Sequence, residues 1–293
     1  MRSARSGVIA WPIYLCLPRA AIRSVERKII PCAQYDAVLI DEGHDFKPEW
    51  FKLIVQMVNP DTNSLLVLYD DAQSIYNGPK KLSFSFSSVG IQAKGRTTVL
   101  KLNYRNTAEI LSVARAFADD LLSTKEAEDD QAPTVQPISA GRRGPKPLLI
   151  QLPTLTKEAD FVATKLVEAN RIGTPWRDMA VLYRRYEIGQ QIAKVLEKRS
   201  IPFQWQKSGK NSYSPGHNSV KLITMHSSKG LEFPMVCIPA IGAQAKEDLD
   251  LHNEARLLYV AMTRATQELV MTHGAESIFA GKMQKAMGVL HTI

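Results

Sequence analysis

Two adjacent carboxylates, Asp41 and Glu42, directly follow an apolar run at residues 35–40 that has the composition of a buried strand. In open α/β sheets, ligands bind beyond the carboxyl ends of the strands. A carboxylate pair at such a position suits phosphoryl transfer, because one carboxylate can hold Mg²⁺ while the other orients or deprotonates an attacking water. An acidic pair can also be a solvated turn that ends a strand, so the pair alone leaves both interpretations open.

Further polar blocks follow expected strands in the same manner. Gln73 lies in a block at residues 70–76 after the next apolar run, which places it at the same sheet edge as the acidic pair. Arg105 comes directly after the third run. Taken singly, such an arginine is more often a surface ion-pair partner than a catalytic group. Two longer blocks come later, Thr-Met-His-Ser-Ser-Lys-Gly-Leu-Glu-Phe at 224–233 and Glu-Ala-Arg-Leu-Leu-Tyr-Val-Ala-Met-Thr-Arg-Ala at 254–265.

The spacing of apolar residues predicts the elements that position these side chains. Short apolar runs, each followed by a polar loop and a helical pattern, are typical of α/β units around a parallel sheet. A helix at 106–122 is expected to begin with Asn106 as its cap and Glu109 completing a capping box. The other expected helices are 48–58, 157–169, 189–199 and 253–264. The expected strands are 35–40, 65–69, 99–102, 148–152, 179–183, 220–224, 236–239 and 268–271.

The length of 293 residues and the ordinary apolar fraction are sufficient for two domains with cores of their own. We expect a first domain over residues 1–102 and a second over residues 103–293. Residues 123–147 are rich in Pro, Gly, Ser and charged side chains, which predicts a flexible surface excursion within the second domain.

In order and content, the five polar blocks resemble the Walker B and later motifs of superfamily 1 DNA helicases of the UvrD/Rep type. The resemblance extends over residues 35–273, and the two longest blocks are its most specific part. Residues 35–107 further resemble a branch of these helicases that is often fused to a nuclease-related domain. The resemblance implies an α/β fold of P-loop NTPase (RecA-like) lobes with parallel sheets, the first lobe incomplete and the second complete.

The resemblance also implies catalytic roles for residues that match the motifs. Asp41 is implied to hold Mg²⁺, and Glu42 to activate the attacking water. Gln73 is implied to sense the γ-phosphate of ATP. Arg105 and Arg264 are implied to be arginine fingers, a role that suits a guanidinium because its planar fork stabilises charge on equatorial phosphate oxygens.

Binding roles follow from the same resemblance. Gly230 and Glu232 are implied to lie beside the sugar and phosphates of the nucleotide. Thr224 and His226 are implied to contact single-stranded DNA, and Tyr76 to stack on a base. The implied cofactors are ATP and Mg²⁺, and the implied direction of unwinding is 3′ to 5′.

The sequence departs from the family most clearly in the P-loop, Gly-x-x-x-x-Gly-Lys-Ser/Thr, whose backbone amides and lysine hold phosphate. This chain has two Gly-Lys pairs, at 209–210 and 281–282, and they are followed by Asn211 and Met283 instead of Ser or Thr. Both pairs also come after the acidic pair, whereas the P-loop of the family comes before it. The 40 residues before Asp41 are too few for the strands and helices of a P-loop lobe. In addition, His44 stands where the family has Gln, and Asn77-Gly78 where it has Arg-Trp.

Charge and cysteine content narrow the function classes. Lys and Arg total 37 against 29 Asp and Glu, and the net charge of +8 suits a polyanionic partner. The three cysteines lack metal-ligand spacing, and no apolar run approaches the ~20 residues of a membrane-spanning helix. Arg2 and Arg5 precede an apolar run in the manner of a secretory signal, but Pro12 interrupts that run. We expect a cytoplasmic protein without membrane contact.

Together these features predict a portion of an ATP-dependent DNA helicase that moves on single-stranded DNA and is not competent alone without a P-loop. A separate polypeptide that supplies the P-loop lobe is then an expected partner. Two other interpretations stay open: a non-enzymatic nucleic-acid-binding or regulatory module, and a truncated gene remnant. The retention of Glu42, Gln73, Arg105 and Arg264 favours the helicase, since a binding module has no need for all four.

Overall fold

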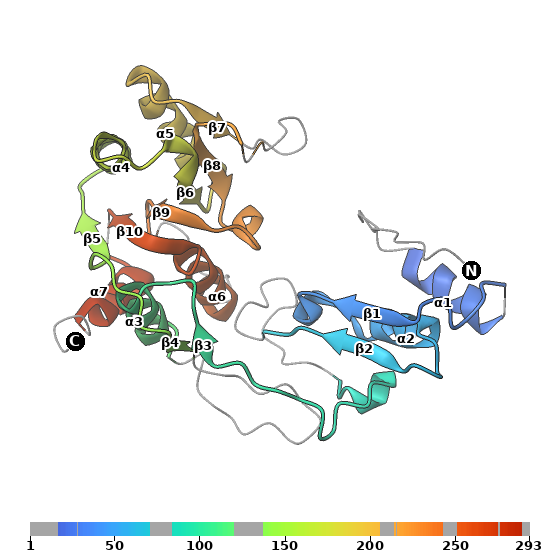
Figure 1. Ribbon diagram of the computed structural model, residues 1–293. Coiled ribbons are helices and arrows are strands. Elements are labelled where there is room, and N and C mark those ends of the chain that lie inside the picture. The colour runs from blue at the N-terminus through green and yellow to red at the C-terminus, as the bar shows by residue number, and fades with distance from the viewer. Residues whose placement is uncertain are drawn as a thin grey trace. The chain divides into compact units, whose positions relative to one another are not determined.

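The computed structural model describes residues 17–27, 29–70, 84–119, 137–205, 214, 216–242, 251–274 and 276–288 (Figure 1). These residues form two compact units. The first unit comprises the described residues up to Asp70 together with 84–97, and the second comprises those from 98 onward. The two domains expected at 1–102 and 103–293 stay a prediction.

The first unit contains a two-stranded parallel sheet backed by helices. Its elements are α1 (Leu17–Glu26), β1 (Ala37–Ile40), the 3-10 turn η1 (Gly43–Asp45), α2 (Pro48–Met57), β2 (Ser64–Val67) and the 3-10 turn η3 (Ser87–Val89). Phe51 of α2 is fully buried against Ile40 and Val89 and forms the centre of a small core. Leu39 and Leu66, which are opposite each other in the sheet, are 63% and 56% exposed. The sheet is therefore apolar on a face that the described residues leave open.

The second unit is built on a six-stranded, fully parallel sheet in the order β5-β10-β9-β6-β8-β7 (Figure 1). The strands are β5 (Leu148–Gln151), β6 (Met179–Tyr183), β7 (Phe203–Trp205), β8 (Val220–Thr224), β9 (Phe233–Ile238) and β10 (Ala265–His273). The helices are α3 (Ala108–Phe117), α4 (Leu155–Arg171), α5 (Tyr186–Lys198), α6 (Leu251–Met262) and α7 (Ile278–Gly288), with 3-10 turns η4 (Trp176–Asp178) and η5 (His226–Ser228). The prediction of an α/β fold with parallel sheets is confirmed.

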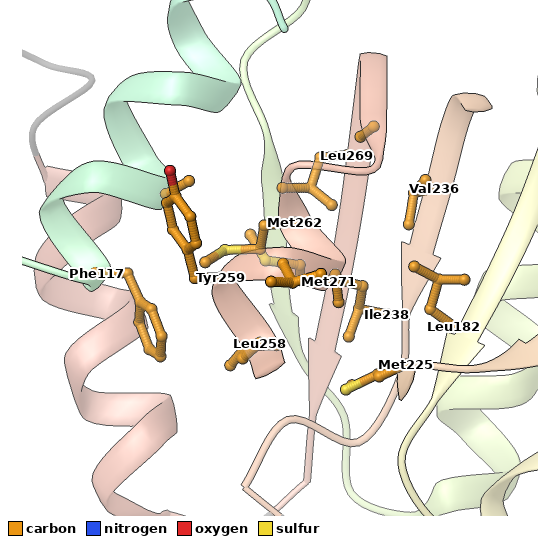
Figure 2. Close-up of a cluster of buried hydrophobic side chains, with 14 of the residues drawn as sticks. Phe117, Leu182, Met225, Val236, Ile238, Leu258, Tyr259, Met262, Leu269 and Met271 are labelled. Carbon is orange, nitrogen blue, oxygen red and sulfur yellow. The ribbon is translucent and has the colours of Figure 1, made fainter. Parts of the chain in front are cut away.

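Helices cover both faces of this sheet, which explains why its central strands are apolar throughout. All five residues of β6 are buried. Ala180 and Leu182 of β6 belong to a core shared with α3, α6 and α7, whereas Met179 and Val181 belong to a core shared with α4 and α5. Figure 2 shows the first of these cores, where Met262 of α6 lies among strand side chains. The alternation places neighbouring side chains of one strand on opposite faces.

The start of α3 differs from the prediction. Thr107, and not Asn106, caps the helix, with its hydroxyl accepting a hydrogen bond from the Ile110 amide. Asn106 is 1% exposed and its Nδ2 donates to the carbonyl oxygens of Thr263 and Ala265 at 2.9 and 2.6 Å. The predicted cap was wrong because this side chain satisfies two backbone carbonyls far along the chain, a demand that local sequence does not reveal.

Part of the predicted flexible excursion at 123–147 has a defined structure. Its strand β4 (Ile138–Ser139) pairs in parallel with β3 (Leu102–Asn103). The carboxylate of Glu109 accepts hydrogen bonds from the Gly144 amide at 3.0 Å and from Arg143 Nη1 at 3.2 Å. Glu109 therefore fixes this segment instead of completing a capping box, and the strand expected at 99–102 is reduced to β3. Residues 120–136 lie outside the described part of the chain.

The later helices match their predicted positions to within a few residues. α4 and α5 begin two and three residues before the expected starts at 157 and 189, and α6 ends at Met262. Arg264 consequently lies in the turn between α6 and β10 and not on the helix. The short elements β4 and β7, and the helices α1 and α7, were not predicted. In the part of the chain that the structure describes, no helix has both the length and the apolar content to cross a membrane.

Candidate functional site

The second unit brings four predicted residues together around the segment 230–232, which leads from η5 into β9. Arg105 Nε lies 2.6 Å from Glu232 Oε1. Arg264 Nη1 donates to the carbonyl oxygen of Leu231 at 3.3 Å. Gly230 turns the chain with a φ of +77°, a left-handed conformation that glycine adopts without strain. Two arginines from separate blocks thus contact one short segment that also carries a carboxylate.

The backbone at Arg105 is held by a side-chain network. Asn103 Oδ1 accepts the amides of Arg105 and Asn106, both at 2.9 Å, which forms an Asx turn directly after β3. Arg142 Nη1 donates to the Arg105 carbonyl at 2.7 Å. The side chains of Arg105 and Glu232 are 57% and 37% exposed. An exposed pair of this kind contributes little to stability, so the Arg105 guanidinium can exchange Glu232 for another anion at low cost.

Arg264, in contrast, is 2% exposed. Its Nε donates to the Val260 carbonyl at 3.0 Å, in addition to the Nη1 bond to Leu231. The Arg264 carbonyl in turn accepts the Phe233 amide at 2.9 Å. A phosphate-binding role would therefore require this guanidinium to give up or share carbonyl acceptors that it holds in the structure.

Thr224 and His226 lie at the carboxyl end of β8. The Thr224 hydroxyl accepts the Ser227 amide at 3.1 Å and lies 2.9 Å from the Ser227 hydroxyl, which closes the turn into η5. His226 is half-buried beside Arg184 and Glu254. Burial and the positive charge of Arg184 lower the pKa of His226 below its ordinary value of 6.5, while Glu254 acts in the opposite direction. These surroundings favour the neutral imidazole over the charged form.

Sequence analysis missed the ion pair between Arg184 and Glu254. Arg184 Nε lies 3.0 and 2.9 Å from the two oxygens of Glu254, and its Nη2 also contacts this carboxylate. A signal was present, because Arg184 directly follows the buried strand β6 in the same way that Asp41 follows β1. The pair joins the strand-end loop of β6 to the block at 254–265.

The acidic pair lies in the first unit, in a tight turn between β1 and η1. Glu42 has a φ of 54°, a left-handed conformation that is uncommon for a residue other than glycine. Its amide donates to Asp41 Oδ1 at 2.9 Å. Its carboxylate lies 3.0 Å from His44 Nε2, and His44 Nδ1 accepts the Asp70 amide at 3.1 Å. Since Nδ1 accepts, Nε2 carries the proton in the neutral ring, and His44 holds the Glu42 side chain. Backbone strain of this kind often occurs at functional sites.

The chemistry of the acidic pair fits a magnesium ion. Asp41 is exposed at the carboxyl end of β1 and offers a hard oxygen ligand. Mg²⁺ in nucleotide sites typically takes one or two carboxylates together with phosphate oxygens and water. Glu42, His44 and Asp45 also place ligand atoms within 4.8 Å of one another. That group includes the hydrogen-bonded His44, so Asp41 remains the better candidate.

Two predicted residues, Gln73 and Tyr76, lie outside the described residues. Arg105, Gly230, Glu232 and Arg264 lie together, Thr224 and His226 lie on the adjacent loop of the same unit, and Asp41 and Glu42 lie in the first unit. The functional roles of all ten stay predictions.

Comparison with known proteins places this geometry in context. The family described as the UvrD-like helicase C-terminal domain matches residues 98–213 and 206–276. The chain is 31% identical over 171 residues to a probable DNA helicase II homolog of Mycoplasma capricolum, covering 58% of this chain and 22% of that protein. It is 32% identical over 181 residues to the mitochondrial ATP-dependent DNA helicase HMI1 of Saccharomyces cerevisiae, covering 60% of this chain and 25% of that protein.

A solved structure, the C-terminal domain of a possible DNA helicase from Lactobacillus plantarum, is similar with a TM-score of 0.46 and 19% identity, covering 63% of this chain and 96% of that one. The chain spans a quarter or less of the length of the two curated relatives. The family match covers more than half of the chain. The resemblance to UvrD/Rep-type helicases is thereby confirmed, and the chain belongs to the family of UvrD-like helicase C-terminal domains.

Proposed function

We propose that the chain is the part of an ATP-dependent DNA helicase that supplies arginine side chains to the nucleotide and holds single-stranded DNA. The observation that carries this proposal is the convergence of Arg105 and Arg264 on the segment 230–232. Guanidinium groups that reach a transferred phosphoryl group stabilise the charge that develops on it. The names of the two relatives, a DNA helicase II homolog and an ATP-dependent DNA helicase, support the same assignment.

The exposure of the two arginines indicates different roles for them. Arg105 is exposed and loosely paired, so it is the arginine that can move from Glu232 to a phosphate oxygen. Arg264 is buried and holds the segment 230–232 through its hydrogen bond to the Leu231 carbonyl. In the first unit, Asp41 would hold Mg²⁺, and Glu42, positioned by His44, would orient the attacking water. ATP and Mg²⁺ supply the transferable phosphoryl group and its counter-charge when bound.

A P-loop is the element that this sequence does not contain, and we propose that it comes from another segment of a longer protein or from a separate polypeptide. Exposed apolar side chains on the β1–β2 sheet support this, since Leu39 and Leu66 would be covered by further lobe elements. The 3′ to 5′ direction of movement and a nuclease-related fusion are proposed from the resemblance alone. Without the P-loop, the chain by itself should not turn over ATP.

The decisive test joins the chain to the P-loop lobe of a close relative and measures DNA-stimulated phosphate release. Arg105→Ala should lower turnover by roughly 10³-fold or more, the scale of an arginine finger. Its unfolding free energy should change by less than about 1 kcal/mol, because the pair with Glu232 is exposed. Arg105→Lys should not restore turnover, since an ammonium cannot bridge two oxygens.

Arg199→Ala is the matched control, because Arg199 is a surface arginine paired with Asp160 at 3.3 Å on the α4–α5 side of the unit. It should leave turnover unchanged. Equal turnover in Arg105→Ala and the unaltered fusion would remove Arg105 from the nucleotide site. The chain alone provides a second check: magnesium- and DNA-stimulated phosphate release above that of Glu42→Gln would refute the need for a P-loop.

A non-enzymatic nucleic-acid-binding module is the second candidate, favoured by the net charge of +8 together with the missing P-loop. Both candidates require binding of single-stranded DNA. The affinity should fall with salt, with a logarithmic slope near −0.7 for each phosphate neutralised. Restored turnover in the fusion would decide between them.

A further inference from the structure

We propose that Tyr186 and Trp205 form a base-stacking platform for single-stranded DNA, beside the loop that carries Thr224 and His226. This inference rests on the proposed function and extends it to a site outside the blocks that resemble the helicase motifs. Its basis is a stacked aromatic pair, its rigid support and its position at the carboxyl edge of the sheet.

The two rings are arranged as a stack that reaches the surface. Their centroids are 5.3 Å apart and their planes differ by 22°. Trp205 is half-buried at the end of β7, and Tyr186, the first residue of α5, is 54% exposed. Nucleobases stack on exposed aromatic rings irrespective of sequence, and such contacts are a common means of holding a single strand. The outer ring thus offers a surface of the kind that a base requires.

The platform is held from below by a buried tyrosine. Trp205 Nε1 donates to the hydroxyl of Tyr183 at 2.8 Å, and Tyr183 is 2% exposed. The Tyr183 ring lies so close under α5 that a Cβ on Gly189 would be 2.7–2.9 Å from three of its atoms. Glycine at position 189 therefore makes room for this ring. Because the aromatic stack is already ordered, binding a base incurs little additional conformational entropy.

Strand register places the platform next to the predicted DNA loop. β8 lies between β6 and β7, with Tyr183 opposite Thr224 and Trp205 opposite Leu222. Tyr183 thus connects the aromatic pair to the strand end from which Thr224 and His226 project. Arg185, adjacent to Tyr186, is 47% exposed and pairs with Glu187 at 3.4 Å, and its positive charge favours a nearby phosphate of the bound DNA.

An alternative is that the stack only shields the core around Trp205. The two roles separate in binding measurements with a fluorescently labelled dT oligonucleotide and an abasic oligonucleotide of equal length, which has the same phosphates but no bases. Tyr186→Ala should weaken binding of the dT oligonucleotide about fivefold or more, the scale of one lost base stack. It should leave binding of the abasic strand unchanged, and Tyr186→Phe should retain the affinity for dT.

Ile172→Ala serves as the matched control, because Ile172 is 84% exposed and lies after α4, toward the amino end of β6. It should bind both oligonucleotides like the unaltered chain. Trp205→Phe, with circular dichroism to verify folding, should weaken dT binding in the same direction as Tyr186→Ala. Unchanged dT binding by Tyr186→Ala, or an equal loss on the abasic strand, would overturn the platform while DNA binding stands. An unaltered chain that binds neither oligonucleotide would refute the proposed function and the platform with it.

Discussion

Replacement of Asn106 by alanine should destabilise the second unit more than the loss of any single exposed contact would. Asn106 Nδ2 donates to the carbonyl oxygens of Thr263 and Ala265, on either side of Arg264, and its Oδ1 accepts from Asn103 at 2.9 Å. A buried polar group that loses its partner costs about 1–3 kcal/mol. With two buried carbonyls affected, we expect Asn106→Ala to lower the unfolding free energy by about 3 kcal/mol.

The assay must report on the second unit alone. Cys237 is fully buried in β9, and burial raises the pKa of its thiol, so it reacts only when this unit opens. Thiol labelling across a urea gradient, in a background with Cys16 and Cys32 replaced by serine, therefore measures the stability of the second unit. For a unit of this size, a loss of ~3 kcal/mol corresponds to a decrease in Tm of roughly 6–12 °C.

Asn170→Ala is the control of identical chemistry. Asn170 is half-buried and its Nδ2 makes one bond, to the Thr174 carbonyl at 3.0 Å, so the expected change is within about 1 kcal/mol. Asn106→Asp should be worse than Asn106→Ala, since it directs a carboxylate at two carbonyl oxygens. If Asn106→Ala and Asn170→Ala reduced stability equally, the two hydrogen bonds of Asn106 to the Thr263 and Ala265 carbonyls could not have the stabilising effect assigned to them.

Three further perturbations test other parts of the second unit. Gly189→Ala should lower its stability by about 1–3 kcal/mol in urea denaturation, because the new Cβ would overlap the Tyr183 ring; an unaffected midpoint would contradict that contact. Folding lowers the pKa of His226, so near pH 6.5 the unfolded chain binds more protons at this residue than the folded chain does. The unfolding free energy should therefore decline as the pH falls through 6.5. His226→Gln should remove this portion of the pH dependence, and an identical pH profile would count against it. Lys221→Met should lower the unfolding free energy by about 2 kcal/mol, because the buried ammonium donates to Gln204 Oε1 at 2.8 Å and to two carbonyls at 2.9 Å. Calorimetry of both proteins would detect this change. Equal stability would show that water satisfies these acceptors in the variant.

The central strands were predictable because their sequences satisfy the demands of two buried faces at once. β6 and β9 are apolar over their whole length, and that pattern has few alternatives. The two-residue strand β4 and the three-residue strand β7 are too short for any period to be recognised. They exist because a partner strand supplies their hydrogen bonds, and the partner is known only from the fold.

The candidate site was predictable in its membership but not in its contacts. Sequence blocks pointed to Arg105, Glu232 and Arg264, yet nothing local indicates that Arg105 pairs with Glu232, more than 100 residues away. The pairing of Arg184 with Glu254 was missed for the same reason. Side-chain partners depend on strand order, and strand order is a property of the whole sheet.

The position of β10 in the sheet has a consequence for how the polypeptide is made. β5 is the first strand of this sheet to leave the ribosome, and among the described strands its neighbour is β10, which is the last. More than 100 residues separate the two, which is roughly 5–20 s of translation. During that interval the apolar side chains of β5 and α4 are exposed, because their β10 partners have not been synthesised. Nascent chains should therefore recruit chaperones until residue 273 has emerged. A premature stop before β10 would leave a product without the strand that joins β5 to β9. Proteolytic quality control should remove such a product.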